Sequence, residues 1–200
     1  DDTDTQDFYY DLGGSTCGFS SCDGSPALAG VDTVDLFYTA THGGTTARNA
    51  YLMMFEEDSY ELSTDWRYGD DNNQVAIFSQ YSCTVMENHD DLIWDRWGPA
   101  FRGGVYIVTG SHDSVYSSTT TEDVGRDYAD GLQKSKSVRD AWFDGNADFH
   151  LDQDLAVMAV GSSSTNCWNR VDQIRWQNFT SFQRLRNIDM THWCRTRITR

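Results

Sequence analysis

The sequence predicts an α/β fold, a three-layer α/β/α sandwich with a mostly parallel central sheet. The first observation is a set of short apolar runs, bounded by turn formers, which are typical of strands buried on both faces. The second is that segments with the apolar spacing of amphipathic helices separate several of these runs. Because strands connected through helices usually run in the same direction, this alternation predicts a parallel sheet covered by helices.

Four segments are expected to form this sheet. They are residues 31–41, 74–82, 104–109 and 155–160, and each is dominated by apolar or β-branched residues. The run within 49–58 fits a strand or a short helix, and this alternative stays open.

Helical spacing is clearest in three segments: about 88–98, 122–133 and 137–143. In the first, Trp94 and Trp97 fall on one side, and Gly98-Pro99 should end the helix because the residue before proline disfavours helical geometry. The stretch 168–186 is expected to be a mixed helical or irregular tail.

The 200 residues are expected to form one domain, which is long enough for one substantial core. Residues 1–30 are an acidic, loop-rich extension, and residues 161–200 are expected to pack on the domain as a C-terminal tail. The chain begins with Asp1 rather than Met, so we expect that a leader or pro-segment has been removed.

The charge restricts the partners. The formal charge is −16, and 26 of the acidic residues are aspartate, whereas Lys134 and Lys136 are the only lysines. Nucleic acid and anionic membranes are not expected partners because both require a basic surface. An aspartate-rich, lysine-poor surface is typical of life in high salt; an acidic secreted protein from an ordinary habitat is the alternative.

Five cysteines leave at least one thiol free if the others are paired. Cys17 and Cys22 could close a small ring, and Cys167 and Cys194 bracket the C-terminal segment. The simplest pairing therefore leaves Cys83 free, and disulfides indicate a secreted protein. The alternative is that all five are reduced and Cys83 is an inert core residue.

His42 and Cys83 each follow an apolar run, at 31–41 and 74–82. In parallel sheets the binding crevice lies beyond the carboxyl ends of the strands, so we expect these two side chains to lie next to each other there. An imidazole beside a thiol is the minimum equipment for nucleophilic acyl transfer. A serine hydrolase is not expected, because the sequence has no G-x-S-x-G motif.

The order of these motifs resembles the caspase-fold cysteine peptidases, which include caspases, metacaspases, legumain, gingipains and clostripain. The resemblance covers roughly 31–160 and rests on His42-Gly43, then about forty residues, then Ser82-Cys83. The segments beginning at Phe101 (FRGGVYIVTG) and Gly125 (GRDYADGL) and the pair Ala141-Trp142 further resemble a poorly characterised bacterial and archaeal branch of this fold.

The resemblance implies an extracellular cysteine peptidase, expected to be a monomer that cleaves a peptide or protein substrate. Cys83 would be the nucleophile, His42 would protonate the leaving amine, and the amides of Gly43 and Cys83 would form the oxyanion hole. Caspases place Gln-Ala before the cysteine, whereas Tyr81 and Ser82 stand here. A catalytically inactive binding or structural module with this fold is therefore the alternative.

Asp113 is the candidate substrate-binding residue. It follows the strand expected at 104–109, and in basic-specific members of this fold acidic residues form the floor of a pocket for Arg or Lys. The alternative is an aspartate in solvent, one of many in this chain.

No metal is expected to be required for the reaction. Zinc donors are present, but without a close-spaced ligand pair: His42, Cys83, His89 and His112. Calcium is a candidate structural ion at Asp144-Gly-Asn146-Ala-Asp148 or at the acidic segment 1–7, although the former lacks the sixth-position glycine and the final glutamate of an EF-hand.

Overall fold

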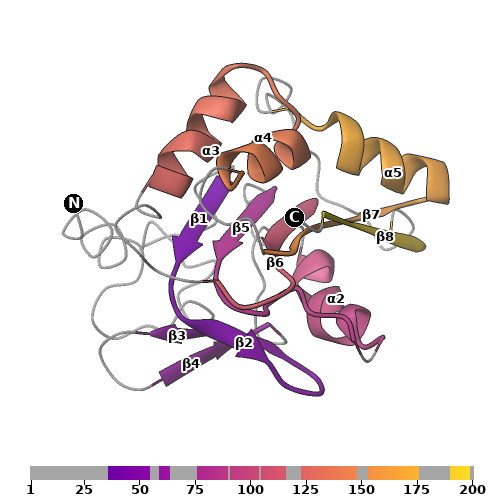
Figure 1. Ribbon diagram of the computed structural model, residues 1–200. Helices are drawn as coiled ribbons and strands as arrows, with labels where there is room; N and C mark the ends of the chain where they lie inside the picture. The colour runs from indigo at the N-terminus through magenta and orange to yellow at the C-terminus, as the bar shows by residue number, and fades with distance from the viewer. Residues whose placement is uncertain are drawn as a thin grey trace, which may run out of the picture.

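The computed structural model describes residues 36–54, 59–63, 76–89, 91–103, 105–115, 123–147, 153–175 and 190–198. These residues form an α/β fold with a five-stranded sheet, ordered β1-β5-β6-β7-β8, and a smaller sheet, ordered β2-β3-β4 (Figure 1). The expected extension at 1–30 lies outside the described residues.

The larger sheet contains β1 (Leu36–Ala40), β5 (Ile77–Tyr81), β6 (Ile107–Ser111), β7 (Leu155–Gly161) and β8 (His192–Ile198). The smaller, antiparallel sheet contains β2 (Gly43–Thr45), β3 (Ala50–Met54) and β4 (Ser59–Leu62). The described helices are α2 (Ile93–Gly103), α3 (Val124–Gln133), α4 (Val138–Gly145) and α5 (Ser164–Gln173).

Helices cover both faces of the larger sheet, as the uninterrupted apolar strands predicted (Figure 1). In β7 the side chains of Ala156, Met158 and Val160 pack on the face that α2 covers. The alternate residues of β7 pack on the other face, which is covered by α3, α4 and α5. Because an apolar core covers each face of the sheet, β5 and β6 lie at the centre of the molecule. Every residue of both strands is buried.

The sheet is mixed rather than fully parallel. β1, β5 and β6 run parallel, but β7 runs antiparallel to β6, and β8 runs antiparallel to β7. Two helices, α3 and α4, lie between β6 and β7, and their close approach leaves no room for a Cβ at Gly131 beside Ala141. After two packed helices the chain re-enters the sheet at the edge where β6 ends, so the next strand, β7, runs antiparallel to β6. A single crossover helix would return the chain to the opposite edge and give a parallel strand.

Two local predictions were wrong. Pro99 lies inside α2 instead of ending it, because Ala100 and Phe101 beyond it are buried in the core and their packing outweighs the local preference. The C-terminal tail is more regular than expected: α5 begins at Ser164, with Ser163 as its side-chain cap, and β8 adds a fifth strand. The open alternative at 49–58 is decided in favour of a strand, β3.

A disulfide between Cys167 and Cys194 joins α5 to the edge strand β8, with their Cα atoms 6.0 Å apart. This confirms one expected pair, and Cys83 is free as expected. Cys17 and Cys22 lie outside the described residues. In the part of the chain that the structure describes, no helix has the length and apolar character needed to cross a membrane.

Candidate active site

His42 and Cys83 follow the carboxyl ends of two neighbouring parallel strands, β1 and β5. The register of these strands runs from Leu36 opposite Ile77 to Ala40 opposite Tyr81. The next backbone amide, that of Thr41, still donates to the carbonyl of Tyr81 at 3.3 Å. His42 and Cys83 each stand two residues beyond the last pair of this register.

Asp113 lies beside the turn that follows Cys83. The parallel register of β5 and β6 ends with Ser79 opposite Thr109. Beyond it the chain turns back along the end of β6: the amide of Thr84 donates to the carbonyl of Asp113 at 3.0 Å, and that of Met86 donates to the carbonyl of Ser111 at 2.9 Å. His42, Cys83 and Asp113 therefore all follow strands that end at the same edge of the sheet.

Gly43 packs tightly between the segments that carry the site. A Cβ atom at this position would lie 2.9 Å from the Cβ of Ser82, 2.9 Å from Val85 and 2.8 Å from the carbonyl oxygen of Tyr51. The glycine therefore lets the backbone after His42 approach the backbone before Cys83. Close packing is therefore a sufficient reason for a glycine at this position, apart from the oxyanion-hole role that the resemblance implies for its amide.

Cys83 is half-buried, and its sulfur contacts the backbone of Val115. The thiol donates to the carbonyl oxygen of Val115 at 3.4 Å, and the amide of Val115 donates back to the sulfur at 3.4 Å. The amide could stay in place as a donor if the thiol lost its proton. His42, by contrast, is exposed to solvent.

The backbone turns sharply directly after the thiol. Thr84 has φ of 49°, in the left-handed region, which is unfavourable for a β-branched residue. Backbone strain of this kind concentrates at functional sites and persists only where the surroundings hold it.

Contacts from α2 and β2 hold the segment that follows. The indole of Trp97 donates to the carbonyl of Val85 at 2.9 Å, and the buried Arg96 donates to the carbonyl of Glu87 at 2.9 Å. The hydroxyl of Thr45 donates to the carboxylate of Glu87 at 2.8 Å. These bonds fix the loop after Cys83 against both the helix and the smaller sheet.

A family model described as a domain of unknown function (DUF6345) matches residues 19–197. The chain belongs to the DUF6345 family. The match includes both sheets and all the site residues described above. No curated protein matches the chain.

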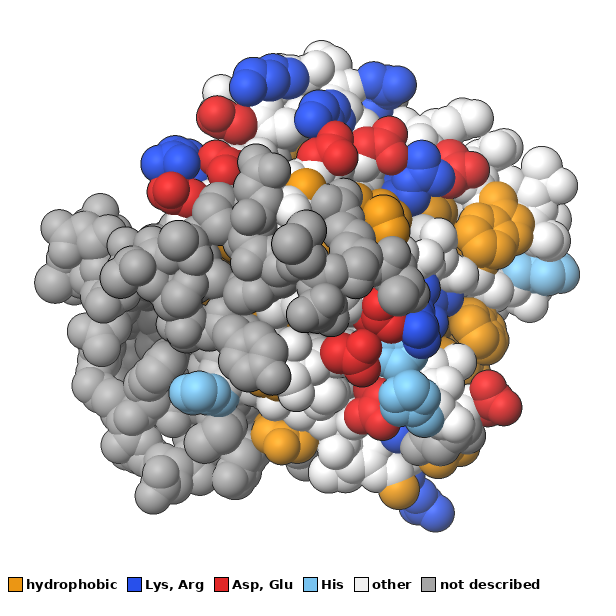
Figure 2. Space-filling model, viewed as in Figure 1, with side chains coloured by type: hydrophobic (Ala, Val, Ile, Leu, Met, Phe, Trp, Pro, Cys, Tyr) orange, Lys and Arg blue, Asp and Glu red, His pale blue; other side chains and the backbone are white. Residues whose placement is uncertain are grey.

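The DUF6345 domain carries a cluster of charged and imidazole side chains around Asp113. Asp154 is buried at the start of β7, and its carboxylate binds Arg197 of β8 at 2.5 Å. Figure 2 shows a mixed group of histidine, acidic and basic side chains on the face in view. Burial of Asp113, followed by the neighbouring carboxylate of Asp154, raises the pKa of Asp113.

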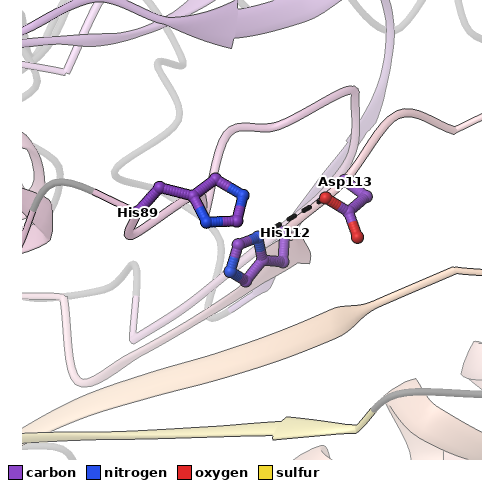
Figure 3. Close-up of side chains that lie close together, drawn as sticks. All are labelled: His89, His112 and Asp113. Atoms are coloured by element: carbon purple, nitrogen blue, oxygen red, sulfur yellow. Dashed lines mark ion pairs between the residues drawn. The ribbon is translucent and has the colours of Figure 1, made fainter.

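His112 is a neutral imidazole inside this cluster. Burial, followed by the charges of Arg195 and Arg197, lowers the pKa of His112 to about 4. Its Nδ1 lies 3.7 Å from the Oδ1 of Asp113 (Figure 3), and among the described residues it has no hydrogen-bond partner. The ring of His89 packs edge-on against it, with the centroids 4.6 Å apart.

His89 and His112 are among the candidate zinc donors of the sequence, whereas no sequence pattern indicated Asp154, Arg195 or Arg197. Those two arginines belong to β8, the strand that the sequence pattern did not reveal. Of the proposed zinc donors, the structure brings His89 and His112 together, with Asp113 as the third donor in place of His42 or Cys83.

The described part of the proposed calcium loop has other partners. The carboxylate of Asp144 binds Lys136 at 2.8 Å, and the amide nitrogen of the buried Asn146 donates to the carbonyl of Trp142 at 2.8 Å. Asp148 and the segment 1–7 lie outside the described residues.

Proposed function

We propose that this DUF6345 domain is an extracellular cysteine peptidase with a caspase-like fold and a His42/Cys83 dyad. The observation that carries the proposal is the register of β1 and β5: His42 and the free Cys83 each stand two residues beyond its last pair, Ala40 and Tyr81. The buried sheet, the tight Gly43 turn and the strained residue after the thiol support it.

In the proposed reaction the Cys83 thiolate adds to the carbonyl carbon of the scissile bond and forms a carbon–sulfur bond. The amides of Gly43 and Cys83 bind the oxyanion that develops. His42 donates its proton to the leaving nitrogen as the carbon–nitrogen bond breaks. A water molecule, deprotonated by His42, then adds to the thioester carbonyl, and the carbon–sulfur bond breaks; this releases the carboxylic acid and regenerates the Cys83 thiolate and the protonated His42.

Asp113 is the proposed specificity residue for a basic side chain of the substrate. Its carbonyl accepts a hydrogen bond from the amide of Thr84, the residue after Cys83, and its side chain is 46% exposed. A carboxylate at this place would attract Arg or Lys next to the bond that is cut. The proposed substrate is therefore a peptide or protein with a basic residue at that position.

The extracellular location is proposed from the disulfide between Cys167 and Cys194 together with the acidic composition.

Two observations favour the alternative, an inactive binding module. Cys83 exchanges two hydrogen bonds with the backbone of Val115, as a purely structural cysteine also could. Two large aromatic side chains, Trp168 and Trp193, are exposed and could contribute to a binding surface.

A panel of reporter peptides with Arg, Lys, Asp or Asn before the cut, assayed in high salt with and without calcium, tests the peptidase. Cys83→Ala and His42→Ala should each reduce cleavage by orders of magnitude, and the double variant should be little worse than either single variant. His192→Ala is the matched control. His192 is exposed and lies on β8, the outer strand on the opposite side of the sheet from β1, where it pairs with Gly161. Cleavage that survives Cys83→Ala, or no cleavage of any peptide, would favour the binding module.

A further inference from the structure

We propose that His89, His112 and Asp113 form a binding site for a divalent transition metal, with Zn²⁺ as the representative ion. Each residue offers one donor atom, and the three donors lie within 4.8 Å of one another (Figure 3). Two segments supply them: His89 lies in the loop after Cys83, and the other two follow β6.

The distances suit a small ion. Zinc binds imidazole nitrogen at about 2.0–2.1 Å and carboxylate oxygen at about 2.0–2.2 Å, so two donors of a tetrahedral site lie about 3.4 Å apart. His112 Nδ1 and Asp113 Oδ1 are already 3.7 Å apart. The remaining gap can close by rotation of His89, which is exposed, and of Asp113, which is about half-exposed.

The state of His112 points to a ligand. Its side chain is only 2% exposed, and its Nδ1 faces the cluster without a hydrogen-bond partner among the described residues. A buried polar nitrogen left unpaired is costly, and a metal ion at this position would satisfy it.

The donor set selects the class of ion. Two imidazoles and one carboxylate suit zinc and other first-row transition metals, whereas calcium and magnesium prefer oxygen donors alone. A divalent ion would also offset the repulsion between the neighbouring carboxylates of Asp113 and Asp154. Asp154 stays bound to Arg197 and would act as a partner of the ligand Asp113 rather than as a ligand itself.

The bound ion would join the loop after Cys83 to the end of β6, the two segments that flank the thiol. It would also occupy the carboxylate that the proposed peptidase uses for a basic substrate. The metal site does not depend on Cys83 being a nucleophile, since the thiol is not one of its donors.

Calorimetric titration of the metal-free full chain with zinc chloride tests the site. We expect one equivalent to bind, and His89→Ala and Asp113→Asn each to weaken binding at least tenfold. Both residues are exposed enough for the fold to survive these changes, and circular dichroism can verify it. His192→Ala is the matched histidine control and should bind as the wild type does.

Cys83→Ser separates this site from zinc capture by the thiol. Binding that is unchanged in Cys83→Ser and weakened in His89→Ala supports the site, and a tetrahedral visible spectrum with Co²⁺ would support it further. Absence of binding by the wild type, equal binding by wild type and His89→Ala, or loss of binding in Cys83→Ser would each overturn it.

Discussion

A Cβ atom on Gly43 would lie 2.9 Å from the Cβ of Ser82, closer than real Cβ contacts come. The turn after His42 therefore packs directly against the residue before Cys83, and the same packing holds the segments that carry the two candidate catalytic residues.

Gly43→Ala should consequently lower both stability and activity. The added methyl group meets the carbonyl oxygen of Tyr51 at 2.8 Å, which cannot move aside as a flexible side chain can. Overpacking of this kind costs about 1–3 kcal/mol, and chemical unfolding would measure it. Gly98→Ala in α2 is the control: its nearest neighbours are side-chain atoms of Trp94 and Arg102, and alanine favours the helix. Equal stability of the two variants would contradict this account of Gly43.

Removal of the Cys167–Cys194 disulfide should destabilise the fold by about 3–4 kcal/mol, from the chain entropy of a loop with a sequence separation of 27. The variant is Cys167→Ser/Cys194→Ser, measured by urea unfolding. Because the bond holds the edge strand β8 on α5, hydrogen exchange should increase first in β8. Uniform faster exchange throughout the sheet would argue against this local role.

Tyr128 should make the protein sensitive to alkali. Burial raises the pKa of Tyr128 well above its ordinary value, although the hydrogen bond with Ser79 at 2.9 Å opposes this. The unfolded chain loses this proton near pH 10 while the folded chain keeps it, so stability is fully present below about pH 10 and falls as the pH rises further. Tyr128→Phe should flatten the fall, whereas Ser79→Ala, which keeps the phenol, should not. Parallel pH profiles for wild type and Tyr128→Phe would refute the assignment.

Molar salt should stabilise the protein. With a formal charge of −16, repulsion among carboxylates outweighs the few surface ion pairs, such as Arg126–Asp123 and Lys136–Asp144, that salt would weaken. Figure 2 shows basic and acidic side chains interspersed near α3 and α4, where these two pairs lie. Melting temperatures in dilute buffer and in molar potassium chloride measure the balance, and a lower value in salt would remove the argument for a saline habitat.

The α/β class, and the position of His42, Cys83 and Asp113 after strands that end at the same edge of the sheet, could be predicted because parallel strands end at one edge. The direction of β7 was not predicted, although both helices before it were expected at 122–133 and 137–143, because an alternation of strands and helices ordinarily indicates single crossovers and therefore parallel strands. β8 escaped prediction because it is an edge strand with a largely polar, partly exposed sequence. Its contacts are also remote: Arg195 donates to the carbonyl of Met86 at 2.8 Å, across 109 residues of chain. No local sequence pattern therefore indicated the charged cluster around His112.

The rate at which iodoacetamide alkylates Cys83 in the folded protein tests the dyad most directly. Peptide mapping assigns the modified residue, and the rate is compared between wild type, His42→Ala and the control His192→Ala. The dyad predicts that Cys83 reacts near neutral pH faster than a free small-molecule thiol, and that His42→Ala alone slows it. A thiol that reacts only when the protein unfolds, or at the same rate with and without His42, would contradict the account.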